Sequence, residues 1–151
     1  MHVRIATVDD ALAVETVRIQ GWQAAYRGFV ADSYLDRLVI DADRRASLIA
    51  AEGVTTLVAV DPDVIGMAVH GPSREAADEV ELYALYVDPR AWRTGAGSAL
   101  LAACDGVTVL WVLEDNVRAR AFYRRHGFVA DGGSKVLDLD GPVTEIRMRR
   151  G

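Results

Sequence analysis

Residues 80–113 constrain the fold more than any other part of the sequence. Two strand-like runs, VELYALYV (80–87) and VTVLWVL (107–113), are separated by a glycine-containing turn and a short helical run. The connection from Asp88 to Gly106 exceeds the dozen or so residues that a parallel crossover needs. A helix of about ten residues spans ~15 Å and a strand of five spans ~17 Å, so the helix can return the chain alongside its sheet. A β-α-β unit is therefore feasible here.

The rest of the sequence adds elements on both sides of this unit. Further strands are expected at 3–6, 55–61, 64–72, 129–139 and 143–150, and helices at 9–22, 41–52, 97–104 and 116–128. Residues 25–36 are expected to be irregular, and the Asp-Pro-Asp turn at 61–63 indicates a hairpin. The order is β-α-α-β-β-β-α-β-α-β-β, without a repeat or a linker, which predicts one α/β domain over residues 1–151 around a mixed sheet.

Composition excludes several classes of protein. With 151 residues, 51% hydrophobic and 26% charged, the chain is long and apolar enough for one globular domain. No apolar run approaches the ~20 residues of a membrane span, and the first ten residues do not resemble a signal peptide. Cys104 is the only cysteine, and the three histidines show no metal-ligand spacing, so no disulfide or metal site is expected. A cytoplasmic protein is the expectation.

Charge is distributed unevenly along the chain. The net charge is −5, yet residues 90–125 hold six arginines and three acidic residues, a net charge of +3 that leaves −8 for the remainder. A local basic region in an acidic protein favours a small anionic ligand over nucleic acid. An arginine-rich helix face exposed to solvent is the alternative reading.

The turn in WRTGAGSALL (92–101) has the properties of an anion site. Where a strand turns into a helix, free backbone N–H groups and the helix dipole attract negative charge, and glycine lets the ligand approach. The turn has no Gly-Lys-Ser/Thr, so it is not a P-loop, and it lacks the third small residue and the acidic residue of a dinucleotide fingerprint. A plain tight turn is the alternative.

Two blocks together resemble the GNAT superfamily of N-acetyltransferases. VDPRAWRTGAGSALL resembles its Arg/Gln-x-x-Gly-x-Gly/Ala motif, which binds the acetyl-CoA pyrophosphate through backbone amides, with Gly95 and Gly97 at the glycine positions. LWVLEDNVRARAFYRRHGF resembles the segment in which an asparagine precedes a helix bearing a tyrosine. The blocks cover residues 80–128, about a third of the chain. The resemblance implies a mostly antiparallel sheet of about seven strands with flanking helices.

The resemblance also implies a cofactor site. It assigns the pyrophosphate to Trp92, Arg93, Thr94, Gly95, Ala96, Gly97 and Ser98. The backbone of Leu85, Tyr86 and Val87 is expected to pair with the pantetheine arm like an added strand. Asn116 is expected to bond the pantetheine, to cap the following helix, or both. Trp92 departs from the motif because it replaces the usual Arg or Gln, and the helix after Gly97 is shorter than in similar proteins.

Catalytic roles follow from the same resemblance. Acetyl transfer to an amine needs a general base and a proton for the departing thiolate. Glu81 is the expected base, with Glu79, Asp78 or an ordered water as alternatives, and Tyr123 is the expected acid. A tyrosine has an ordinary pKa of about 10 and is therefore protonated at neutral pH. The residues expected to bind the acceptor are Trp22, Tyr26, Tyr83 and Glu145, although Trp22 and Tyr26 fit a core equally well.

The resulting hypothesis is an acetyl-CoA-dependent N-acetyltransferase that acts on a primary amine, first of all an amine of a small molecule, by direct attack in a ternary complex. A protein N-terminus or lysine is the alternative acceptor, and a non-catalytic acyl-CoA sensor is the alternative from another class. A pure binder would need neither Glu81 nor Tyr123. No nucleic acid and no membrane are expected as partners, and a homodimer is allowed by the resemblance alone.

Overall fold

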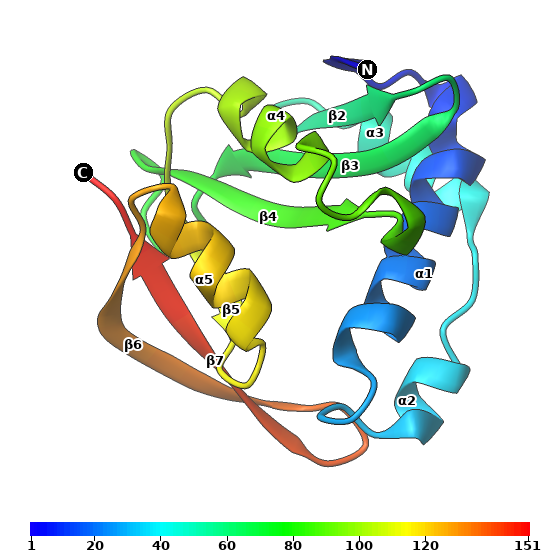
Figure 1. The fold of residues 1–151 in the computed structure, drawn as a ribbon. Coiled ribbons are helices and arrows are strands. Elements are labelled where there is room, and N and C mark those ends of the chain that lie inside the picture. Colours follow the sequence, from blue (N-terminus) through cyan, green and yellow to red (C-terminus); the bar gives the residue numbers. More distant parts are fainter.

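A twisted seven-stranded sheet runs through the computed structural model, which describes residues 1–151 (Figure 1). The strands are β1 (His2–Ile5), β2 (Thr55–Val60), β3 (Val64–Pro72), β4 (Val80–Val87), β5 (Val107–Leu113), β6 (Val129–Asp138) and β7 (Pro142–Arg149). Their order is β1-β2-β3-β4-β5-β7-β6, and only β4 and β5 pair in parallel. The expected mixed, mostly antiparallel sheet is confirmed.

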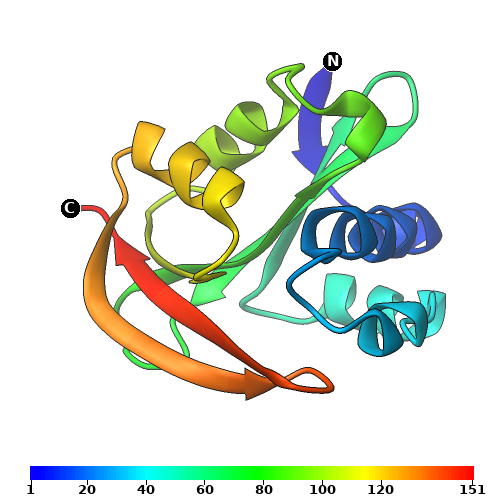
Figure 2. The ribbon, with the colours of Figure 1, turned by 60° about the horizontal axis from the view of Figure 1, so that its bottom comes forward.

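Helices cover both faces of the sheet (Figure 2). They are α1 (Ala11–Tyr26), α2 (Asp32–Asp36), α3 (Ala42–Ala50), α4 (Ala96–Ala103) and α5 (Val117–Arg125). The first three lie on one face and the last two on the other. Helix α2 lies in the segment expected to be irregular, and α1 continues four residues beyond the expected end at residue 22. None of the helices combines the length and the hydrophobicity needed to cross a bilayer.

Short polar side chains define where the helices begin. Before α1, the Thr7 N–H donates to Asp10 Oδ2 at 2.8 Å, which is one half of a capping box. Before α5, Asn116 Oδ1 accepts from the Ala119 N–H at 3.1 Å, so Asn116 caps this helix as expected. Gly127 ends this helix with φ = 89°, a conformation that glycine adopts without strain. These local bonds fix α5 directly after β5.

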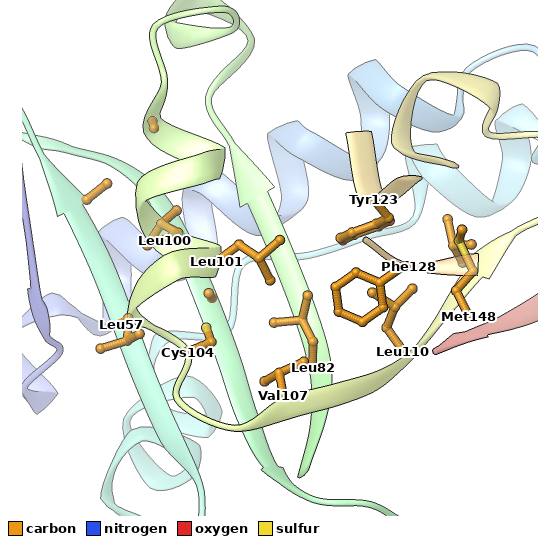
Figure 3. Packing of buried hydrophobic residues seen from close by; sticks show 14 of the residues in the cluster. Leu57, Leu82, Leu100, Leu101, Cys104, Val107, Leu110, Tyr123, Phe128 and Met148 are labelled. Carbon is orange, nitrogen blue, oxygen red and sulfur yellow. The ribbon is translucent and has the colours of Figure 1, made fainter. Parts of the chain in front are cut away.

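The main core lies between the sheet and the pair α4 and α5 (Figure 3). Leu82 and Leu110 of the two parallel strands contact Leu101 and Phe128, and all four are almost completely buried. Cys104 belongs to the same cluster and is 2% exposed. Its burial raises the pKa of the thiol to about 11, as expected for a packed and unreactive cysteine.

Strands β4 and β5 separate halfway along their length. They pair only from Val80 to Leu82. On its other side, β4 pairs with β3 through Val69–Ala84 and His70–Leu82, which leaves Tyr83 as an extra, bulged residue. A bulge bends and twists a strand. The bend begins where the pairing with β5 ends, so the second half of β4 has a free edge.

Candidate active site

A large cavity opens where the two parallel strands separate. This central cavity has a volume of about 760 Å³ and is lined by residues of α1, β4, α4, β5, α5 and the β6–β7 hairpin. Its turn end includes the β4–α4 turn and the outer side of α5, and its hairpin end includes α1 and the hairpin. A cavity of this size suits a drug-sized or cofactor-sized ligand.

The turn end presents free backbone donors. The N–H groups of Ala96, Gly97 and Ser98 have no acceptor in the protein, whereas the N–H of Ala99 donates to Gly95 O at 3.0 Å. Gly95 has φ = 90°, a left-handed conformation that favours glycine. A Cβ on Gly97 would lie 3.4 Å from the Phe122 ring. The turn is therefore a set of N–H groups at the start of a helix, where anions bind.

The cations at the two ends of the cavity differ in their partners. Arg93, Arg118 and Arg125 line the turn end, and none of them pairs with a carboxylate. At the hairpin end, Arg74 Nη2 lies 2.5 Å from Glu81 Oε2, and Lys135 Nζ lies 3.2 Å from Glu145 Oε1. The turn end therefore carries uncompensated positive charge, while charge at the hairpin end is balanced.

Tyr123 places a phenol on the wall of the cavity. The residue is 8% exposed, and its ring packs edge-on against Phe122 and Phe128. Its hydroxyl forms no hydrogen bond with the protein. Burial raises the pKa of this hydroxyl well above its ordinary value, so it stays protonated and is available as a donor.

Two further tyrosines meet beside the free edge of β4. The hydroxyls of Tyr26 and Tyr86 lie 3.4 Å apart, and burial raises the pKa of both. Gly21 of α1 makes this approach possible, because a Cβ there would lie 3.1 Å from Tyr86 Cβ. Trp22 packs edge-on against Tyr26 at 4.8 Å between ring centroids. All of these aromatic side chains line the central cavity.

Glu81 lies outside the residues that line the cavity. Its side chain is 1% exposed, and Oε1 accepts from the Arg74 backbone N–H at 3.2 Å in addition to the ion pair of Oε2. Arg74 itself does line the cavity. The hydrogen bond that Arg74 donates to Glu81 is the main cause that raises the pKa of Arg74. The Glu81 carboxylate can therefore exchange a proton with a group in the cavity only through a neighbouring residue or through water.

Asn116, Tyr83 and Glu145 line the cavity, as do Leu85 and Val87 on the free edge of β4. The Tyr83 hydroxyl donates to the Pro72 carbonyl, and Arg74 lies 5.3 Å from the centroid of its ring. Of the residues assigned to the cofactor, only Thr94 lies elsewhere. Its Oγ1 donates to Ala91 O at 2.6 Å, and its side chain faces a smaller neighbouring cavity.

The sequence did not indicate several cavity residues: Arg74, Trp111, Phe122, Lys135, Leu137 and Leu139. Arg118 and Arg125 were expected only as members of the basic region at 90–125. Trp111 lies at a half-exposed position of β5. The alternation of side chains along a strand predicts the face of the sheet on which a residue lies, but not which residues contact it. Lys135 Nζ lies 4.1 Å from the centroid of the Trp111 ring, although 24 residues separate the two in sequence. No group of three or more metal-ligating side chains is present.

Comparisons with known proteins agree with this geometry. A family model described as the acetyltransferase (GNAT) family matches residues 18–128. A probable N-acetyltransferase of Mycobacterium tuberculosis is 26% identical over 142 residues, which are 87% of this chain and 82% of that protein.

Two solved structures share the whole fold. PaiA N-acetyltransferase from Thermoplasma acidophilum, in complex with coenzyme A, has a TM-score of 0.75 at 22% identity over 99% of both chains. YncA from Salmonella typhimurium, solved with its cofactor acetyl-CoA, has a TM-score of 0.75 at 22% identity over 98% of this chain and 91% of that one.

Proposed function

The chain belongs to the acetyltransferase (GNAT) family, and from this membership we propose that it transfers the acetyl group of acetyl-CoA to the primary amine of a small molecule. One observation supports a particular orientation of the cofactor in the cavity. The free N–H groups of Ala96, Gly97 and Ser98 and the uncompensated arginines lie together at the turn end. A pyrophosphate is the part of acetyl-CoA that matches them.

The free edge of β4 fits the pantetheine arm. From Leu85 to Val87 this strand has no partner on the β5 side, and both residues line the cavity. An extended amide chain can bond to such an edge as an added strand does. With the pyrophosphate at the turn and the arm along β4, the thioester comes to the middle of the cavity, where Tyr123 lies.

The residues in the middle of the cavity suit the two proton transfers. Acetyl-CoA supplies a thioester carbonyl, which the neutral amine attacks as the bond to sulfur breaks. The Tyr123 hydroxyl, protonated and without another partner, donates its proton to the leaving thiolate. The amine loses a proton to water, which passes it to Glu81 behind Arg74, because Glu81 does not reach the cavity itself.

The hairpin end favours a small acceptor. Three groups of side chains enclose it: Trp22 and Tyr26 from α1, Tyr83 and Trp111 from the central strands, and Leu137, Leu139 and Glu145 from the hairpin. Aromatic faces attract an amine that arrives as a cation. The balanced charges offer nothing that a polyanion would prefer.

The test offers acetyl-CoA and a panel of small amines, peptide N-termini and peptide lysines to the protein. The release of the CoA thiol measures the rate of acetylation. We expect turnover with small amines only. The variant Gly97→Trp should abolish it by filling the turn, while Gly97→Ala, with one Cβ at van der Waals distance from Phe122, should retain most of it. Turnover with peptides alone would contradict the small-molecule acceptor, and CoA binding without any turnover would favour a sensor.

A further inference from the structure

Trp92 forms a rigid platform at the turn end. This residue stands where the motif has Arg or Gln, so the turn lacks its first polar side chain. The indole Nε1–H donates to the carbonyl of Val87, the last residue of β4, at 3.0 Å. This bond fixes the ring across the beginning of the turn. The Arg118 guanidinium carbon lies 3.6 Å from the centroid of that ring.

Arg118 is held in place without a counter-charge. A guanidinium over an indole face is attracted by the ring quadrupole, which restricts its orientation but leaves its N–H donors free. Most other arginines of the chain form ion pairs, such as Arg147 with Asp131 at 2.7 Å, whereas Arg118 forms none. Burial and the nearby Arg93 lower the pKa of Arg118. Its surroundings are therefore rich in cations and lack an anion.

We propose that Arg118, held on Trp92, binds the pyrophosphate of the cofactor and replaces the side-chain contact that the turn lacks. This assignment rests on the proposed function. The guanidinium belongs to α5, whereas the free N–H groups of Ala96, Gly97 and Ser98 belong to α4, and both line the turn end of the central cavity. A guanidinium binds phosphate oxygens with two parallel hydrogen bonds and adds a full positive charge, which backbone N–H groups do not carry.

The test compares ligands that differ in one part of the cofactor. Calorimetry with Arg118→Gln should give a dissociation constant about tenfold to a hundredfold weaker than wild type, the usual effect of losing a hydrogen bond to a charged group. The affinity of Arg118→Gln is expected to fall by the same factor for CoA and for dephospho-CoA, which lacks only the 3′-phosphate. Pantetheine, which lacks the pyrophosphate and the nucleotide, should bind equally to both proteins when followed by NMR at millimolar concentration.

Arg124→Gln is the matched control. It removes the same charge from the same helix at a residue outside the cavity, so CoA affinity should stay within about twofold of wild type. Trp92→Leu should weaken CoA binding by itself but add little to Arg118→Gln, because it acts through the same guanidinium. Circular dichroism and thermal melting confirm that each variant is folded.

Three results would overturn the assignment. Unchanged CoA affinity of folded Arg118→Gln would show that the guanidinium contacts no phosphate. A loss with CoA but not with dephospho-CoA would place it on the 3′-phosphate. If the effects of Trp92→Leu and Arg118→Gln on CoA affinity were fully additive, Trp92 would not act by positioning Arg118. A wild-type protein that binds no CoA at all would instead overturn the proposed function.

Discussion

Tyr123 shows how burial selects one chemical role for a side chain. Its hydroxyl faces the cavity with no partner in the protein, and burial raises the pKa of that hydroxyl. A phenol with a raised pKa keeps its proton at neutral pH and therefore acts as a hydrogen-bond donor, not as a base. A departing thiolate carries a negative charge that can accept this hydrogen bond and then the proton. The geometry therefore suits proton donation to sulfur.

Replacing Tyr123 by Phe should lower kcat by about a hundredfold or more, since a positioned acid contributes a factor of this size. The dissociation constant of acetyl-CoA should change by less than about threefold because the ring remains. Steady-state kinetics and calorimetry measure the two quantities. Tyr34→Phe, which alters a tyrosine that does not line the cavity, serves as the control. An unchanged kcat would remove Tyr123 as the acid.

Glu81→Gln tests the route of the second proton. If Glu81 accepts the proton of the amine through water, kcat/KM should fall in this variant by about tenfold or more, whereas the dissociation constant of acetyl-CoA should change by less than about threefold. Glu79→Gln is the control: Glu79 pairs with Arg149 and does not line the cavity. An unchanged kcat/KM in Glu81→Gln would show that water serves without this carboxylate.

At the scale of single residues, the sequence predicted best those cavity residues whose positions are fixed by local structure. Gly95, Gly97, Asn116 and Tyr123 are recognisable because a turn, a cap and a helix place them in fixed positions relative to their neighbours in sequence. Arg118 was expected only as one of six arginines in a basic region, because its own position depends on a ring 26 residues away in sequence that a bond to β4 orients. Such a contact has no local signature.

The β6–β7 hairpin lines one end of the central cavity. Asp131 on β6 accepts hydrogen bonds from Arg147 and Arg149 on β7, both at 2.7 Å. Partial burial raises the pKa of its carboxyl, but the bonds from Arg147, from the Gly133 N–H and from Arg149 outweigh burial and lower the pKa to about 2. The ionised carboxylate therefore stabilises the hairpin.

This lowered pKa predicts a pH dependence of stability. A carboxyl with a lower pKa in the folded state contributes stability above its unfolded pKa of about 3.9, and the contribution is lost as the pH falls through 2. Between about pH 5 and pH 2, the free energy of unfolding of Asp131→Asn should therefore fall less steeply than that of wild type. At neutral pH this variant should lose no more than about 1 kcal/mol, because solvent screens the pairs.

Urea unfolding at a series of pH values measures this effect. Asp63→Asn, in the exposed turn between β2 and β3 and without an ion pair, should keep the wild-type slope. A parallel loss of stability in wild type and Asp131→Asn would contradict the assigned role of Asp131.

Elements were predicted better than their contacts. Nearly every helix and strand was expected from the sequence. The closure of the cavity by this hairpin was not expected, because the pairing of β7 with β5 joins residues far apart in sequence.

At the scale of the molecule, one local defect creates the site. The bulge at Tyr83 bends β4 away from β5, and the crossover through α4 turns free N–H groups toward the gap. The sequence predicted the strand, the turn and the helix but not the bulge, which depends on how β3 pairs with β4. Residues 18–128, which the family model matches, include the turn, whereas the other end of the cavity is lined by α1 and by the β6–β7 hairpin.

Calorimetric titration of the wild-type protein with acetyl-CoA, with NADH and ATP as controls, tests the central claim most directly. The geometry of the turn and of the free β4 edge predicts a dissociation constant in roughly the micromolar range for acetyl-CoA, and binding of NADH and ATP that is weaker by at least about tenfold. No binding of acetyl-CoA, or equal binding of all three ligands, would contradict the cofactor site.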